Sequence, residues 1–177
     1  MKNIIKVLSC SFLAMLLSAE GFCALNFSVT GDSVFSGKQN GTSYTSQGVS
    51  LFTDYQMMQE WPLALGLMGS FHNRSTGAQS EVAPTMKLWL GSDITGVAAL
   101  QPYARLGYAF SWVNQANGAK AHTNNGLVMN LGNAFAISET VSALAAYTFN
   151  ARTYNNGSSS SAASSHGVSI GFSAELF

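Results

Sequence analysis

The feature that most constrains the fold of this chain is a two-residue alternation of apolar with small or polar side chains. In the final copy, Val168, Ile170, Phe172, Ala174 and Leu176 alternate with glycine, serine and glutamate. Residues two apart lie on the same face of a β-strand, so this copy predicts a strand with one apolar and one polar face. Similar segments occur at residues 25–35, 49–57, 63–72, 84–90, 103–112, 127–137, 141–152 and 167–176. The sequence therefore predicts an all-β fold of eight two-faced strands.

The composition is unusual for a soluble domain and suits a membrane-embedded one. Only 9% of the 177 residues are charged, against about 25% in an ordinary soluble domain. Strands that face lipid on one side and a polar interior on the other need few charges. Most of the segments have about 9–12 residues, the length that a tilted strand needs to cross a bilayer. Because lipid offers backbone groups no hydrogen-bond partners, such strands must close into a barrel.

One stretch allows a second interpretation. Residues 134–146 are rich in alanine and could form a helix. Thr140, Val141, Thr148 and nearby aromatic residues favour a strand instead. We therefore predict strands here as well.

The connectors between the segments alternate in length. They run long, short, long, intermediate, long, short, long, at residues 36–48, 58–62, 73–83, 91–102, 114–125, 138–140 and 153–166. Outer-membrane barrels have long outward loops and short inner turns, which fits a chain whose two ends are both periplasmic. We therefore expect an eight-stranded antiparallel up-and-down transmembrane β-barrel, with both termini in the periplasm.

The N-terminal residues have the layout of a secretory signal peptide. A basic start with Lys2 and Lys6 precedes an apolar run at residues 7–17, and small residues follow near Ala24. The apolar run is shorter than the roughly 20 residues of a membrane-spanning helix. We expect a signal peptide at 1–23, cleaved near residues 21–24, and a barrel domain at 24–177. The setting of Cys10 leaves a lipoprotein signal open as an alternative.

Several motifs resemble those of known barrels. Residues 101–110, QPYARLGYAF, are similar to a fifth-strand signature of small outer-membrane barrels of the opacity-protein-like and OmpA- or OmpX-like families. Residues 131–132 and 146–149 resemble the sixth- and seventh-strand parts of the same pattern. The resemblance implies a barrel in the outer membrane of a Gram-negative bacterium, with exposed loops that contact host surfaces in some relatives.

The end of the chain resembles the signal read by the barrel-assembly machinery. The residues concerned are Gly171, Phe172, Leu176 and Phe177. The resemblance implies that machinery as a partner during assembly, and outer-membrane lipid and lipopolysaccharide as the surroundings of the folded barrel.

The interior of an eight-stranded barrel is just wide enough for side chains. Six charged residues fall on the register that faces it: Asp32, Asp54, Lys87, Arg105, Arg152 and Glu175. The opposite register would place Arg105 in lipid, at a cost of roughly 2–4 kcal/mol. We expect Lys87 and Arg105 to pair with Asp54 and Glu175, with Asp32 and Arg152 nearer the outer mouth. This lumen charge network would be structural, and a gate or binding site is the alternative.

The function that fits best is a non-enzymatic surface protein that presents four polar extracellular loops, for adhesion or another host-surface interaction. The loop residues suited to specific contacts are Tyr44, Arg74, Lys120, His122 and Tyr154. A lipid-A-modifying barrel enzyme and a narrow channel or small-molecule carrier remain alternatives.

A hydrolase would need a serine within reach of an oriented histidine. Ser70 lies on the predicted face of His72, and Ser164 has the same spacing from His166, but serine is common throughout this chain. We therefore expect no catalytic residues and no cofactor. Cys10 and Cys23 lie in the signal segment, which leaves no cysteine cluster for a metal. The formal net charge of zero gives no reason to expect nucleic acid.

Overall fold

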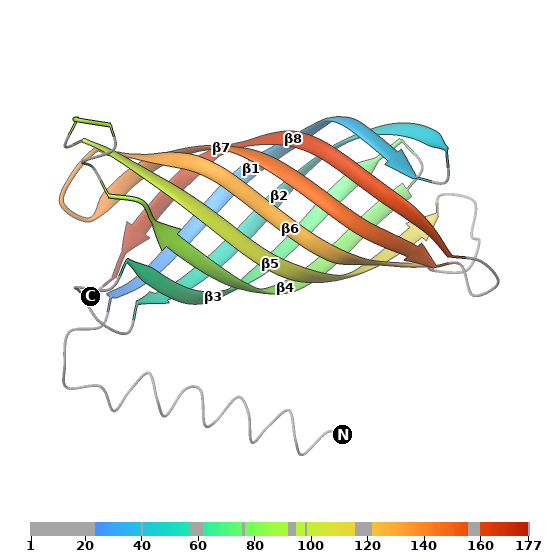
Figure 1. Cartoon of the computed structure of the whole chain (residues 1–177), viewed down its shortest axis with the longest axis horizontal. Coiled ribbons are helices and arrows are strands. Elements are labelled where there is room, and N and C mark those ends of the chain that lie inside the picture. Colours follow the sequence, from blue (N-terminus) through green and yellow to red (C-terminus); the bar gives the residue numbers. More distant parts are fainter. Residues whose placement is uncertain are drawn as a thin grey trace, which may run out of the picture.

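The chain forms a closed antiparallel barrel (Figure 1). The structure, a computed structural model, describes residues 24–39, 41–56, 62–75, 77–91, 95–97, 99–115, 122–155 and 160–176. Its strands are β1 (Ala24–Gln39), β2 (Thr42–Gln56), β3 (Leu63–Arg74), β4 (Gly77–Trp89), β5 (Leu100–Gln115), β6 (His122–Ala136), β7 (Val141–Asn155) and β8 (Ser160–Glu175). The expected signal segment at 1–23 and Phe177 lie outside the described residues.

The predicted eight-stranded antiparallel up-and-down β-barrel is confirmed, while the periplasmic location of its termini stays a prediction. Each strand pairs with its neighbour in sequence, and β8 returns to pair with β1, for example through Val29 and Phe172. The alanine-rich stretch at 134–146 belongs to β6 and β7 and to the turn between them, so it is not a helix. In the part of the chain that the structure describes, no helix is long and apolar enough to cross a membrane.

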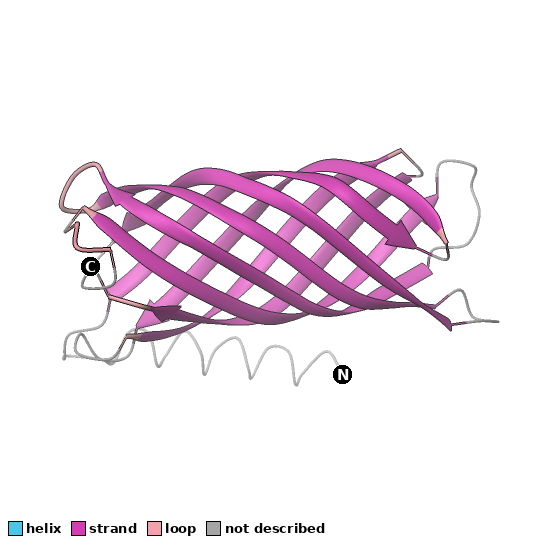
Figure 2. Ribbon diagram, turned by 45° about the horizontal axis from the view of Figure 1, so that its top comes forward, coloured by secondary structure: helices cyan, strands magenta, loops and turns pink. Residues whose placement is uncertain are grey.

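The two ends of the barrel differ in that one contains the first and last strand ends. At one end β1 begins and β8 finishes (left in Figure 1), and we call it the terminal end. The connectors there are residues 57–62, 90–99 and 137–140. The opposite end, joined by residues 40–41, 75–76, 116–121 and 156–159, is called the hairpin end. Figure 2 shows the strands running obliquely between these ends.

The predicted loop lengths are wrong. Residues 36–48 and 73–83, expected to be long loops, are almost entirely strand, and so is most of 153–166. The physical reason is that backbone pairing in a hairpin does not depend on side chains. Serine, threonine and asparagine on both faces hide the period-two signal while the ladder continues. The alternation of long and short connectors is therefore absent.

The outer wall of the barrel carries a belt of exposed apolar side chains. Towards the hairpin end it includes Phe35, Phe71, Phe110 and Trp112, all about half exposed. Beyond these residues the outward side chains become polar, with Gln47, Asn73, Asn114 and Thr153 exposed. Strands of 15 or 16 residues such as β1, β2 and β8 exceed the roughly 9–11 that a bilayer requires. The barrel therefore extends past its apolar belt at the hairpin end.

Closure between β8 and β1 depends on a glycine. A Cβ atom at Gly171 would meet the carbonyl oxygen of Val29 and the Cα of Thr30. Those are backbone atoms of β1, which cannot give way without disturbing the seam. Gly69, by contrast, has nothing within 4 Å of the position of a Cβ.

We expect Gly171→Ala to lower the free energy of unfolding by about 1–3 kcal/mol, the usual cost of forcing an extra methyl into a packed site. Urea unfolding of the barrel in lipid vesicles measures the change. Gly69→Ala is the matched control and should stay within about 0.5 kcal/mol of wild type. Equal unfolding midpoints for the two variants would contradict a tight seam at Gly171.

Candidate functional site

The interior of the barrel is the most distinctive part of the structure, because most of its charged side chains fall into two groups. We call Asp54, Lys87 and Arg105 the terminal cluster, and Asp32, His72, Glu81 and Arg152 the hairpin cluster. Between them lies an apolar layer, which consists of the buried residues Phe52, Met68, Ala83, Ala109 and Val128.

The terminal cluster joins two cations to one carboxylate. Lys87 and Arg105 face each other directly across β4 and β5, an arrangement that is unfavourable for like charges. Asp54 on β2 compensates for it. Its Oδ2 atom lies 3.7 Å from Nζ of Lys87 and accepts a hydrogen bond from the guanidinium of Arg105. The three residues are 0–2% exposed, so the ion pairs are shielded from water.

Aromatic rings supply the remaining compensation in this cluster. Nζ of Lys87 lies 3.6 Å from the ring centroid of Trp89 and 4.8 Å from that of Tyr103. The guanidinium of Arg105 lies 3.9 Å from the ring centroid of Phe52. A desolvated cation–π contact of this kind contributes about 2 kcal/mol. The rings therefore help to hold two cations beside a single carboxylate.

The hairpin cluster is centred on Glu81. Its Oε2 atom accepts a hydrogen bond from Arg152 at 2.5 Å and one from Gln79 at 2.6 Å. Nε2 of His72 lies 4.0 Å from Oε1 of Glu81 and 3.8 Å from Oδ2 of Asp32. The imidazole therefore stands between two carboxylates contributed by β1 and β4.

Further hydrogen bonds hold Arg152 and Asp32 in place. Arg152 also donates to Ser111 at 3.3 Å and to Asn150 at 3.2 Å. On the other side, Asp32 accepts hydrogen bonds from Thr30, at 2.9 Å, and from Ser50. The cluster is thus a connected polar network rather than a set of isolated ion pairs.

Little space is left between these groups. A cavity of about 30 Å³ beside the apolar layer is lined by residues that include Asp32, Phe52, Met68 and His72. A second cavity, of about 20 Å³, lies beside Glu81 and Arg152. A water molecule needs about 10–15 Å³ measured in this way. These voids can hold single waters but not a small-molecule substrate.

Five of the six predicted lumen residues do lie inside the barrel: Asp32, Asp54, Lys87, Arg105 and Arg152. Glu175 is the exception, because it is exposed at the terminal end and lines an open cavity of about 400 Å³ with Glu139. The expected pairing of Glu175 with Lys87 and Arg105 is therefore wrong.

The tilt of the strands explains the position of Glu175. Asp54 and Glu175 both pair with Asn26 of β1, one from each side. In a tilted barrel, each step to the next strand shifts the paired residue along the barrel axis. Two such steps carry Glu175 from the depth of Asp54 out to the mouth.

Sequence reasoning missed Glu81, because residues 73–83 were expected to be a loop. The alternation of Gln79, Glu81, Ala83, Thr85 and Lys87 carries the signal that would have found it, since all five are buried on one face of β4. The same error placed Arg74 in a loop.

Three of the expected loop contacts also point inward. Tyr44, Arg74 and Tyr154 are buried in the lumen, and the guanidinium of Arg74 lies 4.3 Å from the ring centroid of Tyr44. Their predicted role as exposed contact residues is wrong. Lys120 and the side chain of His122 lie outside the described residues.

The remaining predicted residues lie on the surface or near the seam. Phe172 and Leu176 are exposed on the outer wall, and Gly171 lies at the closure with β1. His166 interacts through Nδ1 with the hydroxyl of Tyr147, not with Ser164. In the described part of the chain, no group of three His, Cys, Asp or Glu side chains is placed to hold a metal ion.

We expect Asp54→Asn to lower the free energy of unfolding by about 3–5 kcal/mol, because it leaves two buried cations without a carboxylate. Arg105→Leu should cost less, since Lys87 still neutralises Asp54. Urea unfolding in vesicles measures both. The exposed Glu175→Gln is the control and should change stability by less than about 0.5 kcal/mol. Wild-type stability of Asp54→Asn would show that the cluster does not stabilise the barrel.

The apolar layer should be the barrier to ions. We expect no conductance steps from the wild type in planar bilayers. Phe52→Ala combined with Met68→Ala should produce steps, because both large side chains that separate the two polar clusters are removed. Leu51→Ala, a truncation on the outer wall, is the control and should remain silent. Steps from the wild type would contradict a closed lumen.

Known proteins resemble this chain in structure but not in sequence. No family model matches the chain, and no curated protein matches it by sequence. The crystal structure of Neisserial surface protein A has a TM-score of 0.69 and 13% identity, and the match covers 87% of this chain and 99% of that one. The N-terminal barrel domain of OprF from Pseudomonas aeruginosa has a TM-score of 0.52 and 16% identity, covering 85% and 96%.

A third structure, the outer membrane protein AlkL in lipid bilayers, has a TM-score of 0.52 and 10% identity, covering 90% of this chain and 93% of that one. Identities this low establish a common fold and not a common activity. The chain has the fold of the small eight-stranded outer-membrane barrels.

Proposed function

We propose that this protein is a non-enzymatic surface protein of the bacterial outer membrane, with a closed lumen and with recognition located at its hairpin end. The filled interior carries this proposal. Between the two buried ion clusters and the apolar layer, the described residues line voids of about 30 and 20 Å³. A substrate or permeant solute has no room there, so a function based on contact must use the outside of the barrel.

The membrane setting follows from the outer wall. Leu51, Leu67, Leu106, Leu127 and Ile170 are about half exposed or more, and a surface of this kind is stable when it faces lipid. Export through a cleaved signal peptide at 1–23 and assembly through the C-terminal signal belong to the same proposal. The barrel-assembly machinery and the surrounding lipopolysaccharide would then be partners of the chain.

The proposed orientation places the termini in the periplasm and the hairpin end outside the cell. The support for it is the polar extension of the strands beyond the apolar belt at the hairpin end, since extracellular parts of such barrels are usually the longer ones. The terminal end has Glu139 and Glu175 at its mouth.

The exposed rim of the hairpin end is polar and almost without charge. Its outward residues include Thr45, Asn73, Asn114 and Thr153. Hydroxyl and amide groups recognise partners by hydrogen bonds and not by net charge. We therefore propose adhesion to a neutral hydrogen-bonding surface, such as the sugar hydroxyls of a host cell.

A rim variant tests this function. We expect Thr45→Ala, Asn73→Ala and Asn114→Ala together to reduce the adhesion of expressing cells to host cells by about tenfold, the equivalent of losing one or two net hydrogen bonds. Adherent cells are counted against a non-expressing strain.

The control variant changes polar residues near the other end, with Gln101→Ala, Asn133→Ala and Glu139→Ala, and should adhere like wild type. Labelling of Ser160→Cys by a membrane-impermeant maleimide on whole cells verifies that the hairpin end is exposed. Full adhesion of the rim variant, or absence of adhesion by the wild type, would remove the adhesive role.

A further inference from the structure

Charge is distributed very unevenly between the two faces of the barrel. In the described strands, eight charged side chains lie on the inward register: Asp32, Asp54, Arg74, Glu81, Lys87, Arg105, Arg152 and Glu175. Among those same strands, Lys38 of β1 is the one charged side chain on the outer wall. Because the outer wall of these strands is otherwise uncharged, the outward position of Lys38 calls for a structural explanation.

A β-bulge turns Lys38 outward. The ladder between β1 and β2 shifts register between Val34 and Gly37, and Phe35 and Ser36 are both exposed while Val34 and Gly37 are both buried. Without the extra residue, Lys38 would face the lumen, as Asp32 does. Bulges re-aim side chains in this way, often beside functional sites.

The bulge is also tied to the packing of side chains inside the barrel. A Cβ atom at Gly37 would collide with the ring of Tyr44, so glycine is required for the ring to pack against β1. The register change is therefore built into the packing of the lumen and is not a frayed strand end.

Lys38 borders a depression on the outer wall. The depression has a volume of about 410 Å³ and is lined by Lys38, Ala151, Thr153, Ala162 and Ser164, together with parts of two neighbouring residues. The small alanine side chains create the space, while Thr153 and Ser164 supply hydroxyl groups. Lys38 and Ala151 both pair with Ser164 in the ladders that flank β8. The cation and the hydroxyl groups therefore belong to one site.

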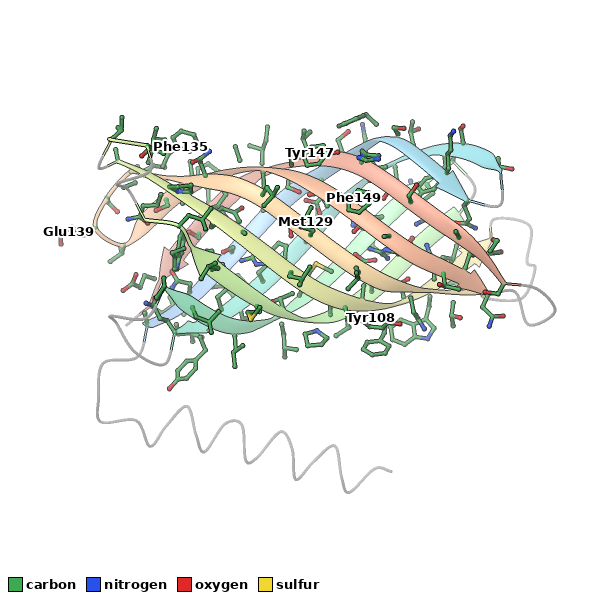
Figure 3. All side chains as sticks on the ribbon, viewed as in Figure 1. Tyr108, Met129, Phe135, Glu139, Tyr147 and Phe149 are labelled. Atoms are coloured by element: carbon green, nitrogen blue, oxygen red, sulfur yellow. The ribbon has the colours of Figure 1, made fainter. Side chains whose placement is uncertain are left out.

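An aromatic shelf lies one step nearer the apolar belt. The hydroxyl of Tyr147 contacts Nδ1 of His166, whose ring centroid is 5.1 Å from that of Phe149. Figure 3 shows Tyr147 and Phe149 along the outer wall of β7. Beyond Phe149 the outward side chains of β7 become small and polar, at Ala151 and Thr153, as at the edge of the apolar belt. The depression therefore lies at the depth of lipid headgroups.

We propose that this depression binds the phosphate of an anionic lipid headgroup. Lys38 pairs with the phosphate, the hydroxyls of Thr153 and Ser164 donate hydrogen bonds to it, and the acyl chains descend over Phe149 and Val168. The inference rests on the membrane location given in the proposed function, but it does not depend on adhesion or on which end faces out.

Lipid retention provides the test. The folded protein in a neutral sugar-headgroup detergent is mixed with phosphatidylglycerol or with phosphatidylcholine, and native mass spectrometry counts the bound lipids. We expect wild type to retain phosphatidylglycerol preferentially. Lys38→Gln should reduce that preference by about fivefold, as expected for one interfacial cation. Lys38→Arg should preserve it.

A variant with its positive charge moved to another strand distinguishes binding at the depression from general attraction between a basic protein and an anionic lipid. Lys38→Gln combined with Asn114→Lys restores the net charge on β5, across the barrel from β1, and should not recover the preference. Recovery there, or an unchanged preference in Lys38→Gln, would overturn the proposal. Displacement of the lipid by an equal concentration of inorganic phosphate would overturn the lipid assignment.

Unchanged heat-dependent gel migration verifies that each variant is folded. Whole-cell adhesion is measured in parallel for Lys38→Gln. Lys38 belongs neither to the rim variant nor to the lumen clusters. A loss of lipid binding in Lys38→Gln with unchanged adhesion would therefore separate the lipid site from the proposed adhesive function.

Discussion

The whole structure depends on pairing every strand edge around a closed sheet. The seam between β8 and β1 joins the last described strand to the first, and it is where Gly171 lets the backbones approach. Without that seam, two strand edges would present unpaired backbone groups to the surroundings. In lipid each such group costs several kcal/mol. In a closed sheet the number of strands, their stagger, their tilt and the width of the interior are linked, and eight strands leave a narrow interior.

A narrow interior explains why its charges are so closely compensated. Side chains from opposite walls meet, and water has almost no volume in which to solvate them. Removing a charge from water is costly unless a partner replaces the solvent. Asp54 compensates Lys87 and Arg105 with help from Trp89 and Phe52. The interior is held by short polar networks with an apolar layer between them.

Side-chain periodicity predicted most of the fold and part of the interior. The apolar positions of the belt, the inward direction of Arg105 and the number of strands followed from alternation and from the cost of charge in lipid. The ends of β1 and β2 could not be predicted, because Ser and Thr on both faces carry no alternating signal. Glu81 was missed because residues 73–83 were expected to be a loop, although the side chains of β4 alternate between buried and exposed. Glu175 was expected to pair with Lys87 and Arg105, but the stagger of the strands places it at the mouth of the barrel.

Residue spacing alone was enough to predict that this chain has two-faced strands, which face of each is apolar, and that charges such as Asp54 and Arg105 share the interior. Those properties depend only on spacing along one strand. Which charges meet became known from the folded barrel, because pairing across the lumen depends on the relative register of strands far apart in sequence. The folded barrel also shows that Lys38 faces outward, since one extra residue in β1 reverses the direction of every side chain beyond it.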